Sequence, residues 1–152
     1  MKLRALVILL LGMIITNNVT AGEKPTASHN SVINHFMDSY INSDYKKLKA
    51  ILSDDAVYTS NRDVRVIKHK GSDILNHLKK NDGVKQKDCN ISSTIISETE
   101  ALVIARIDVN YELFDGNQQN IVVIEKDKKG EWKITQVYKM FTSSESSVKK
   151  LV

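Results

Sequence analysis

Residues 31–78 read SVINHFMDSYINSDYKKLKAILSDDAVYTSNRDVRVIKHKGSDILNHL, and this stretch decides the fold. Its first part carries apolar side chains at helical spacing, and Gly71 precedes another helical pattern. Between them lies the short run Leu52-Ser53-Asp54-Asp55-Ala56-Val57-Tyr58, in which a helix ends and a strand begins. Beyond residue 87 and as far as Phe141, apolar and polar residues alternate as they do in strands.

Three helices are predicted in this stretch. Ser31 can cap the first, Asn42-Ser43 ends it, and Asp44 is a suitable N-cap for the second. Gly71 leads into the third helix, which Ser72 or Asp73 can cap. The apolar side of the first helix is formed by Val32, Ile33, Phe36, Met37, Tyr40 and Ile41.

Six strands are predicted around and after the third helix, at residues 56–60, 64–69, 87–97, 101–114, 119–126 and 131–141. The clearest is 101–114, where Val103, Ala105, Ile107, Val109, Tyr111 and Leu113 point one way and Arg106, Asp108, Asn110 and Glu112 point the other. Ile121 to Ile124 is apolar on both faces, which places that strand centrally or under a partner subunit. We therefore expect an α+β domain, a cone-shaped curved mixed or antiparallel sheet wrapping three N-terminal helices. A sheet curved in this way leaves an apolar hollow, which is a candidate small-molecule pocket.

The N-terminus has the pattern of an export signal. Lys2 and Arg4 precede an apolar run of eleven residues, and small residues at Val19-Thr20-Ala21 offer a cleavage site. We expect residues 1–21 to be a signal peptide, 22–30 a flexible tether, 31–141 the domain and 142–152 a flexible tail. The chain is then exported, periplasmic or secreted, with no stable membrane anchor. A retained single-pass anchor is the alternative, although the run is short for a span.

Charge and cysteine content narrow the function classes. Without Lys2 and Arg4 the basic residues fall from 22 to 20 against 18 acidic ones, so the net charge falls from +4 to +2. With no basic run interleaved with aromatics, we expect no nucleic-acid partner. Cys89 is the only cysteine, so no internal disulfide can form. No histidine or cysteine cluster has ligand spacing, and no phosphate loop appears, so we expect neither a metal nor a cofactor.

The order of these motifs resembles the nuclear transport factor 2-like superfamily, which includes ketosteroid isomerase, scytalone dehydratase and the SnoaL-like polyketide cyclases. The likeness covers about residues 31–141. It rests on the run Phe36 to Tyr45, on Leu48 and Leu52, on Ser53 to Val57, on Gly71 to Leu75 and on Gly130 to Ile134. The resemblance implies a cone-shaped α+β barrel with a deep cavity and a homodimer formed through the sheet.

The resemblance also implies which positions carry isomerase chemistry, and this chain departs from them. Counting from Asp44, the position that matches the isomerase tyrosine of the first helix holds Phe36. Counting from Asp55-Ala56, the position that matches its catalytic aspartate holds Ser60. Phenylalanine cannot donate a hydrogen bond and serine alone is a poor base. Chemistry of the ketosteroid isomerase kind is therefore not expected, and no catalytic residue is assigned.

Pocket-lining candidates come from the apolar sides of the predicted helices and strands. Buried aromatic residues carry an apolar body, and tyrosine adds one hydroxyl that needs a partner. Gln136 interrupts an apolar series between Ile134 and Tyr138, and a buried amide requires a partner or a ligand. His69 ends a strand near the expected mouth, whereas His29, His35 and His77 are expected to be solvated. The candidates are Phe36, Tyr40, Tyr58, Ser60, His69, Tyr111, Trp132, Gln136 and Tyr138; ordinary core packing is the alternative for the aromatics.

Three functions remain open from the sequence. The preferred one is an exported, non-catalytic domain that binds a small, partly apolar molecule or a protein partner and forms a homodimer. The first alternative is a SnoaL-like isomerase, cyclase or hydrolase that acts through His69, Tyr58 or a cavity carboxylate. The second is an interaction module without a ligand, which docks through the polar strand face at Arg106, Asp108, Asn110 and Glu112.

Overall fold

The computed structural model describes residues 28–62, 64–113 and 116–143. The predicted signal peptide, most of the predicted tether and residues 144–152 of the predicted tail lie outside this part. Within it no helix is long or apolar enough to span a membrane.

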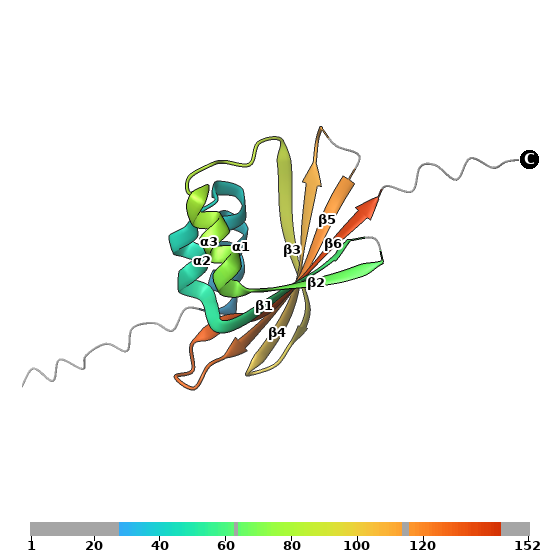
Figure 1. Ribbon diagram of the computed structural model, residues 1–152. Coiled ribbons are helices and arrows are strands. Elements are labelled where there is room, and N and C mark those ends of the chain that lie inside the picture. The colour runs from blue at the N-terminus through green and yellow to red at the C-terminus, as the bar shows by residue number, and fades with distance from the viewer. Residues whose placement is uncertain (1–27, 63, 114–115, 144–152) are drawn as a thin grey trace, which may run out of the picture.

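Three helices and six strands make up the described chain (Figure 1). The helices are α1 (His29–Asn42), α2 (Tyr45–Ile51) and α3 (Gly71–Lys80). The strands are β1 (Leu52–Arg62), β2 (Arg65–Lys70), β3 (Cys89–Glu98), β4 (Leu102–Tyr111), β5 (Gly116–Lys126) and β6 (Trp132–Ser143). The sheet order is β2-β1-β6-β5-β4-β3, and every neighbouring pair is antiparallel except β1 and β6, which are parallel. The predicted α+β class and mixed sheet are thus confirmed, and the sheet is not closed into a barrel.

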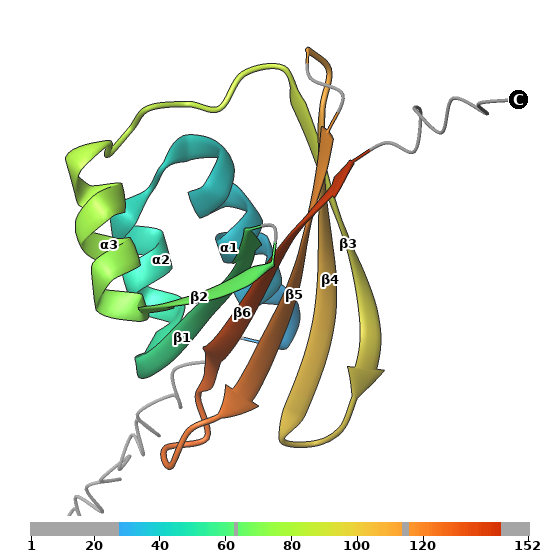
Figure 2. The ribbon, with the colours of Figure 1, turned by 45° about the vertical axis from the view of Figure 1, so that its right-hand side comes forward.

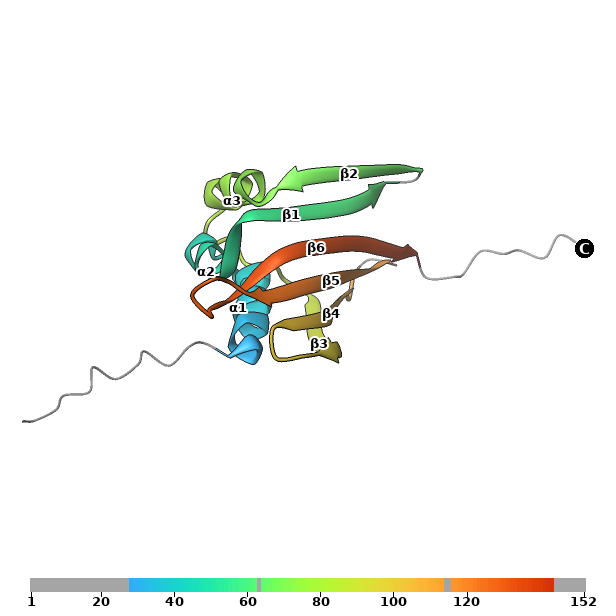
Figure 3. The same ribbon diagram turned by 90° about the horizontal axis from the view of Figure 1, so that it is seen from below.

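The helices all lie on one side of the twisted sheet (Figures 2 and 3). The core forms between them and the inner face of the sheet, where Val103, Ala105, Ile107 and Val109 of β4 are 0 % exposed. The alternation predicted for residues 101–114 is therefore the pattern that builds the core. Strand β5 lies between β4 and β6, which confirms the central position predicted from its two apolar faces.

Several element boundaries differ from the predicted ones by a few residues. Helix α1 begins at His29, because Ser28 is the N-cap and its side chain accepts a hydrogen bond from Ser31 N at 3.3 Å. Residues 28–30 of the predicted tether therefore belong to the domain. Strand β1 begins directly at Leu52, since Leu52 pairs with Ile134 of β6. Strand β6 continues to Ser143, two residues beyond the predicted end.

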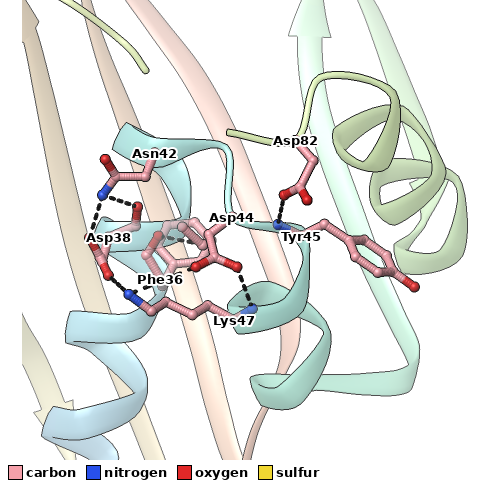
Figure 4. Close-up of polar contacts among 8 residues, drawn as sticks. Phe36, Asp38, Asn42, Asp44, Tyr45, Lys47 and Asp82 are labelled. Atoms are coloured by element: carbon pink, nitrogen blue, oxygen red, sulfur yellow. Dashed lines mark hydrogen bonds and ion pairs between the residues drawn. The ribbon is translucent and has the colours of Figure 1, made fainter. Parts of the chain in front are cut away.

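A polar corner joins α1 to α2 (Figure 4). Asp44 caps α2 as predicted, and its carboxylate accepts from Lys47 N at 3.0 Å. The Lys47 ammonium donates to the Asp38 carboxylate on α1, and Asn42 Nδ2 donates to the same carboxylate at 2.5 Å. The hydrogen bond from Lys47 is the main reason why the pKa of Asp38 lies below its ordinary value. The corner thus holds α1 and α2 at a fixed angle above the sheet.

A bulge in β6 changes which side chains face the helices. Val123 of β5 pairs with Gln136 and Ile124 pairs with Ile134, so Thr135 has no partner position on β5. After this extra residue, Val137 and Lys139 lie on the inner face. The strict alternation predicted for β6 is therefore wrong beyond Ile134. Gln136 and Tyr138 lie on the outer face instead.

Gly71 is required by close packing rather than by backbone freedom. A Cβ atom at this position would lie 2.8 Å from Leu52 Cδ2, 3.2 Å from Ala56 Cβ and 3.3 Å from the Ala56 carbonyl oxygen. Residue 71 therefore sets how closely α3 approaches the start of β1.

We expect Gly71→Ala to lower the free energy of unfolding by about 1 to 3 kcal/mol, because the added methyl group overpacks the contact with β1. Ser72→Ala, one residue along the same helix at an exposed position, should change it by less than about 0.5 kcal/mol. Chemical denaturation of both variants measures the difference. Equal stability of the two would show that the contact relaxes freely.

Candidate functional site

A cavity of about 280 Å³ lies between the helices and the inner face of the sheet. All three helices contribute to its walls, together with strands β1, β5 and β6 and the segment that follows α3. The lining residues are Phe36, Ser39, Tyr40, Ser43, Leu48, Tyr58, Ile74, His77, Leu78, Gln86, Gln118, Asn120, Val137 and Lys139. The walls are mostly apolar and a few polar groups are gathered among them, which is typical of small-molecule sites.

The segment between α3 and β3 forms one wall. Gln86 lies in its non-helical part and lines the cavity. Its backbone N donates to the Ile41 carbonyl at 2.7 Å, near the C-terminal end of α1. Gly83 N contacts the Ser43 carbonyl at 3.4 Å. This wall is therefore held to the corner between α1 and α2 by main-chain bonds.

A row of hydrogen-bonded side chains crosses the inner face of the sheet beside the cavity. The hydroxyl groups of Tyr40 and Tyr111 lie 2.7 Å apart, and Tyr40 Oη donates to Gln118 Oε1 at 2.9 Å. Gln118 Nε2 in turn donates to Asn120 Oδ1 at 2.9 Å. Gln118 and Asn120 are each only 2 % exposed. The row fixes both amides in one orientation and leaves the amino group of Asn120 at its end.

Two buried polar atoms in the cavity lining have no hydrogen-bond partner among the described residues, Asn120 Nδ2 and Tyr58 Oη. Both residues face the cavity, Asn120 from β5 and Tyr58 from β1. Burial raises the pKa of the Tyr58 phenol, so this group keeps its proton at neutral pH. Leaving a buried donor without a hydrogen-bond partner lowers stability by about 1 to 3 kcal/mol. A ligand atom that accepted a hydrogen bond from either group would remove this cost.

Lys139 brings a positive charge to the inner face of β6. It lines the cavity, and burial lowers the pKa of its ammonium from the ordinary value. No aspartate or glutamate is among the lining residues of the cavity. The one other basic side chain in the lining is His77 of α3. The described cavity lining therefore combines serine hydroxyls, side-chain amides, two phenols, one histidine and one lysine, without an acidic group.

The structure brings some of the predicted pocket residues together and separates others. Phe36, Tyr40 and Tyr58 line the cavity. Tyr111 is not among the lining residues, but its hydroxyl is hydrogen-bonded to that of Tyr40. Ser60 and His69 are not among its lining residues, although Tyr58 pairs with His69 across β1 and β2. His77, which we expected to be solvated, is exposed on α3 and also borders the cavity.

Three of the predicted residues lie elsewhere. Trp132 packs edge-on against His29, with ring centroids 5.5 Å apart, so both residues belong to the start of α1 and β6. Gln136 and Tyr138 line a shallow depression on the outer face, where Tyr138 Oη donates to Gln136 Oε1 at 2.5 Å. The bulge at Thr135 turns them away from the helices, so the prediction for these two residues is wrong.

The main polar residues of the site were missed from the sequence. Gln118 and Asn120 continue the inner series of Val122 and Ile124 on β5. The strand was predicted to begin at Gln119, which left Gln118 outside it, and neither residue was among the candidates. Counting back in steps of two from Val122 would have found both. No local signal marks Lys139, because its inward orientation depends on the bulge.

The buried phenols of the site are suited to donating hydrogen bonds. Desolvation raises the pKa of Tyr40 as well as that of Tyr58, so both phenols stay protonated. A carboxylate base is absent from the lining residues. In the described part of the chain no three histidine, cysteine or acidic side chains gather as a metal site.

We expect Tyr40→Phe to lower the free energy of unfolding by about 1 to 3 kcal/mol, because it leaves buried Gln118 Oε1 without its donor. Tyr45→Phe on α2 removes a phenol hydroxyl outside the row and should change it by less than about 0.5 kcal/mol. Urea denaturation compares the two. Equal losses would mean that the row adds no stability.

The fold was compared with known proteins. No family model matches the sequence, and no curated protein matches it. Among solved structures, a nuclear transport factor 2-like protein of unknown function from Shewanella baltica OS155 matches with a TM-score of 0.63 and 14 % identity, over 76 % of this chain and 91 % of that one. A nuclear transport factor 2-like protein of unknown function from Silicibacter pomeroyi DSS-3 matches with a TM-score of 0.60 and 8 % identity, over 76 % and 94 %.

A third neighbour, from Shewanella frigidimarina, bears a name that assigns it provisionally to the ketosteroid isomerases. It matches with a TM-score of 0.55 and 19 % identity, over 76 % of this chain and 97 % of that one. At these sequence identities the similarity establishes the fold and does not establish the chemistry. The chain therefore has the nuclear transport factor 2-like fold that its sequence motifs predicted.

Proposed function

We propose that the protein is an exported, non-catalytic binding protein whose cavity holds a small, partly apolar molecule with a hydrogen-bond acceptor. The observation that carries this proposal is the pair of buried, unpartnered atoms Asn120 Nδ2 and Tyr58 Oη, which both belong to the cavity lining. A cavity that served only as a packing defect would be lined by apolar groups.

The hydrogen-bonded row supports an acceptor rather than a donor on the ligand. Gln118 Nε2 already donates a hydrogen bond to Asn120 Oδ1, so the Asn120 amino group is the part of this amide that can bind a ligand. The Tyr58 hydroxyl keeps its proton and can donate it. A carbonyl or similar oxygen near these groups would satisfy both, while the apolar remainder contacts Phe36, Leu48 and Val137.

Binding is favoured over catalysis by the identity of the lining residues. Phe36 lines the cavity where the resemblance places the phenol of an isomerase, and Ser60 lies outside the lining. No acidic side chain replaces the missing base among the lining residues. The isomerase names of some neighbours describe those neighbours, and in this chain Phe36 stands at the position of the isomerase phenol.

Octanamide is a suitable probe, because it carries an amide oxygen on a short apolar chain. We expect the full chain to bind it, and Tyr58→Phe to weaken binding about 2- to 12-fold through loss of one hydrogen bond. Tyr138→Phe removes a phenol on the outer face and should leave the affinity unchanged. Isothermal titration calorimetry measures all three, and a wild type that bound neither octanamide nor the acid of the same length, octanoate, would refute the proposal.

A second candidate function, self-association through the outer sheet face, is favoured by one exposed feature. Tyr138 is 41 % exposed and pairs across the strands with Ile121, next to the Arg106–Asp108 ion pair at 2.9 Å. An apolar patch with a polar border is typical of a protein interface. The homodimer expected from the sequence would use this face.

If this face forms a homodimer, Tyr138→Glu should shift the protein to the monomer in sedimentation velocity, because it places a charge in the apolar patch. Val84→Glu introduces the same charge at an exposed site in the segment after α3 and should leave the dimer intact. A wild type that sediments as a monomer at all concentrations would exclude the homodimer.

A further inference from the structure

We propose that the cavity selects monocarboxylates with an apolar body, and that Lys139 is the residue which confers this selectivity. The inference rests on the proposed binding function and adds the charge of the ligand to it. Three donor groups line the same cavity from neighbouring strands: the Lys139 ammonium, the Asn120 amino group and the Tyr58 hydroxyl.

The strand register places these groups beside one another. Lys139 of β6 pairs with Asn120 of β5 on one side and with Ser60 of β1 on the other. Tyr58 precedes Ser60 by two residues and therefore shares its face of β1. Directly paired residues have Cβ atoms about 4.5 to 5.5 Å apart, so Lys139 and Asn120 start from adjacent positions on the inner face.

Lys139 lacks the anionic partner that Lys47 and Lys133 have. Lys47 pairs with Asp38, and Lys133 pairs with Glu131 at 3.2 Å. No ion pair of Lys139 occurs among the described residues, and its ammonium lies 5.1 Å from the centre of the Phe141 ring. A half-buried cation without a counter-charge is unfavourable, and a bound anion removes this cost.

The described cavity lining contains one lysine and no acidic side chain. Burial raises the pKa of Tyr40 of α1 and of Tyr58 of β1, so both phenols keep their protons, and His77 of α3 carries no acidic group. The helices and strands that enclose the cavity therefore present no negative side chain to it. A ligand carboxylate would meet one full positive charge and no repulsion.

The number of donors indicates a single carboxylate rather than a more highly charged group. A carboxylate has two oxygens that accept several hydrogen bonds, which matches one ammonium, one amino group and one hydroxyl. A phosphate ester would bring up to two negative charges against one lysine. The remaining wall is apolar and includes Leu48, Ile74 and Leu78, which suits a hydrocarbon or aryl body.

Octanoate and octanamide test this inference, because the two molecules have the same length and shape and differ in charge. At pH 7 we expect the full-length wild type to bind octanoate at least 10-fold more tightly than octanamide, as a charge-assisted hydrogen bond does relative to a neutral one. Lys139→Met should weaken octanoate binding about 10- to 100-fold and change octanamide binding by less than about 2-fold.

Two matched variants separate the role of the charge from that of the fold. Lys139→Arg keeps the charge and should retain the preference for octanoate, while Lys68→Met removes a lysine on the outer face and should change nothing. Thermal unfolding should show that Lys139→Met is folded, because it removes a half-buried charge that has no ion pair among the described residues. If that variant failed to fold, the ratio of octanoate to octanamide affinity in the wild type would still test whether the cavity selects a carboxylate.

Each outcome has a distinct meaning. Binding of octanamide as tightly as octanoate would overturn the carboxylate selectivity and leave the binding function intact. Equal loss of both ligands in Lys139→Met would overturn the role of Lys139 as the selective residue. Failure of the wild type to bind either ligand would overturn the proposed binding function together with this inference.

Discussion

The parallel pairing of β1 with β6 is the constraint on which the rest of the structure depends. It joins the first half of the chain, with its helices and the β1–β2 hairpin, to the meander of β3 to β6. Tyr58 of β1 and Val137 and Lys139 of β6 face one cavity only because these two strands are neighbours. Parallel strands cannot be linked by a tight turn, so the pairing closes a long loop of chain and must be stabilised by the core beneath it.

Along β5, the side chains on the inner face of the sheet change from polar to apolar. Val122 and Ile124 are at most 1 % exposed and belong to the core, whereas Gln118 and Asn120 are equally buried but polar. At the apolar end the helices pack directly on the sheet, and at the polar end the cavity lies beside the hydrogen bond between Tyr40 of α1 and Gln118. The position of the cavity thus follows from where the side chains of one strand cease to be suited to dry packing.

Much of the fold could be predicted from the sequence, because helices and strands each have a characteristic spacing of apolar residues. The apolar side of α1 and the alternation of β4 are local patterns, and Asp44 is a local capping signal. The site was less predictable. The inward positions of Phe36, Tyr40 and Tyr58 follow from those local patterns. Gln136 and Tyr138 point outward because of the bulge at Thr135, and no residue type in the sequence predicts that bulge. Gly71 was identified, although its role is close packing against Ala56 rather than backbone freedom.

The wall at Gln86 differs from the others in how it is secured. Helices and strands are held by repeated main-chain bonds, and opening one of them disrupts many contacts at once. The non-helical segment around Gln86 is fastened near the cavity by its bond to the Ile41 carbonyl. Local opening events require the least free energy where such bonds are few. Solvent exchange, and the passage of any guest molecule, is therefore expected to be fastest on this side, without movement of the sheet.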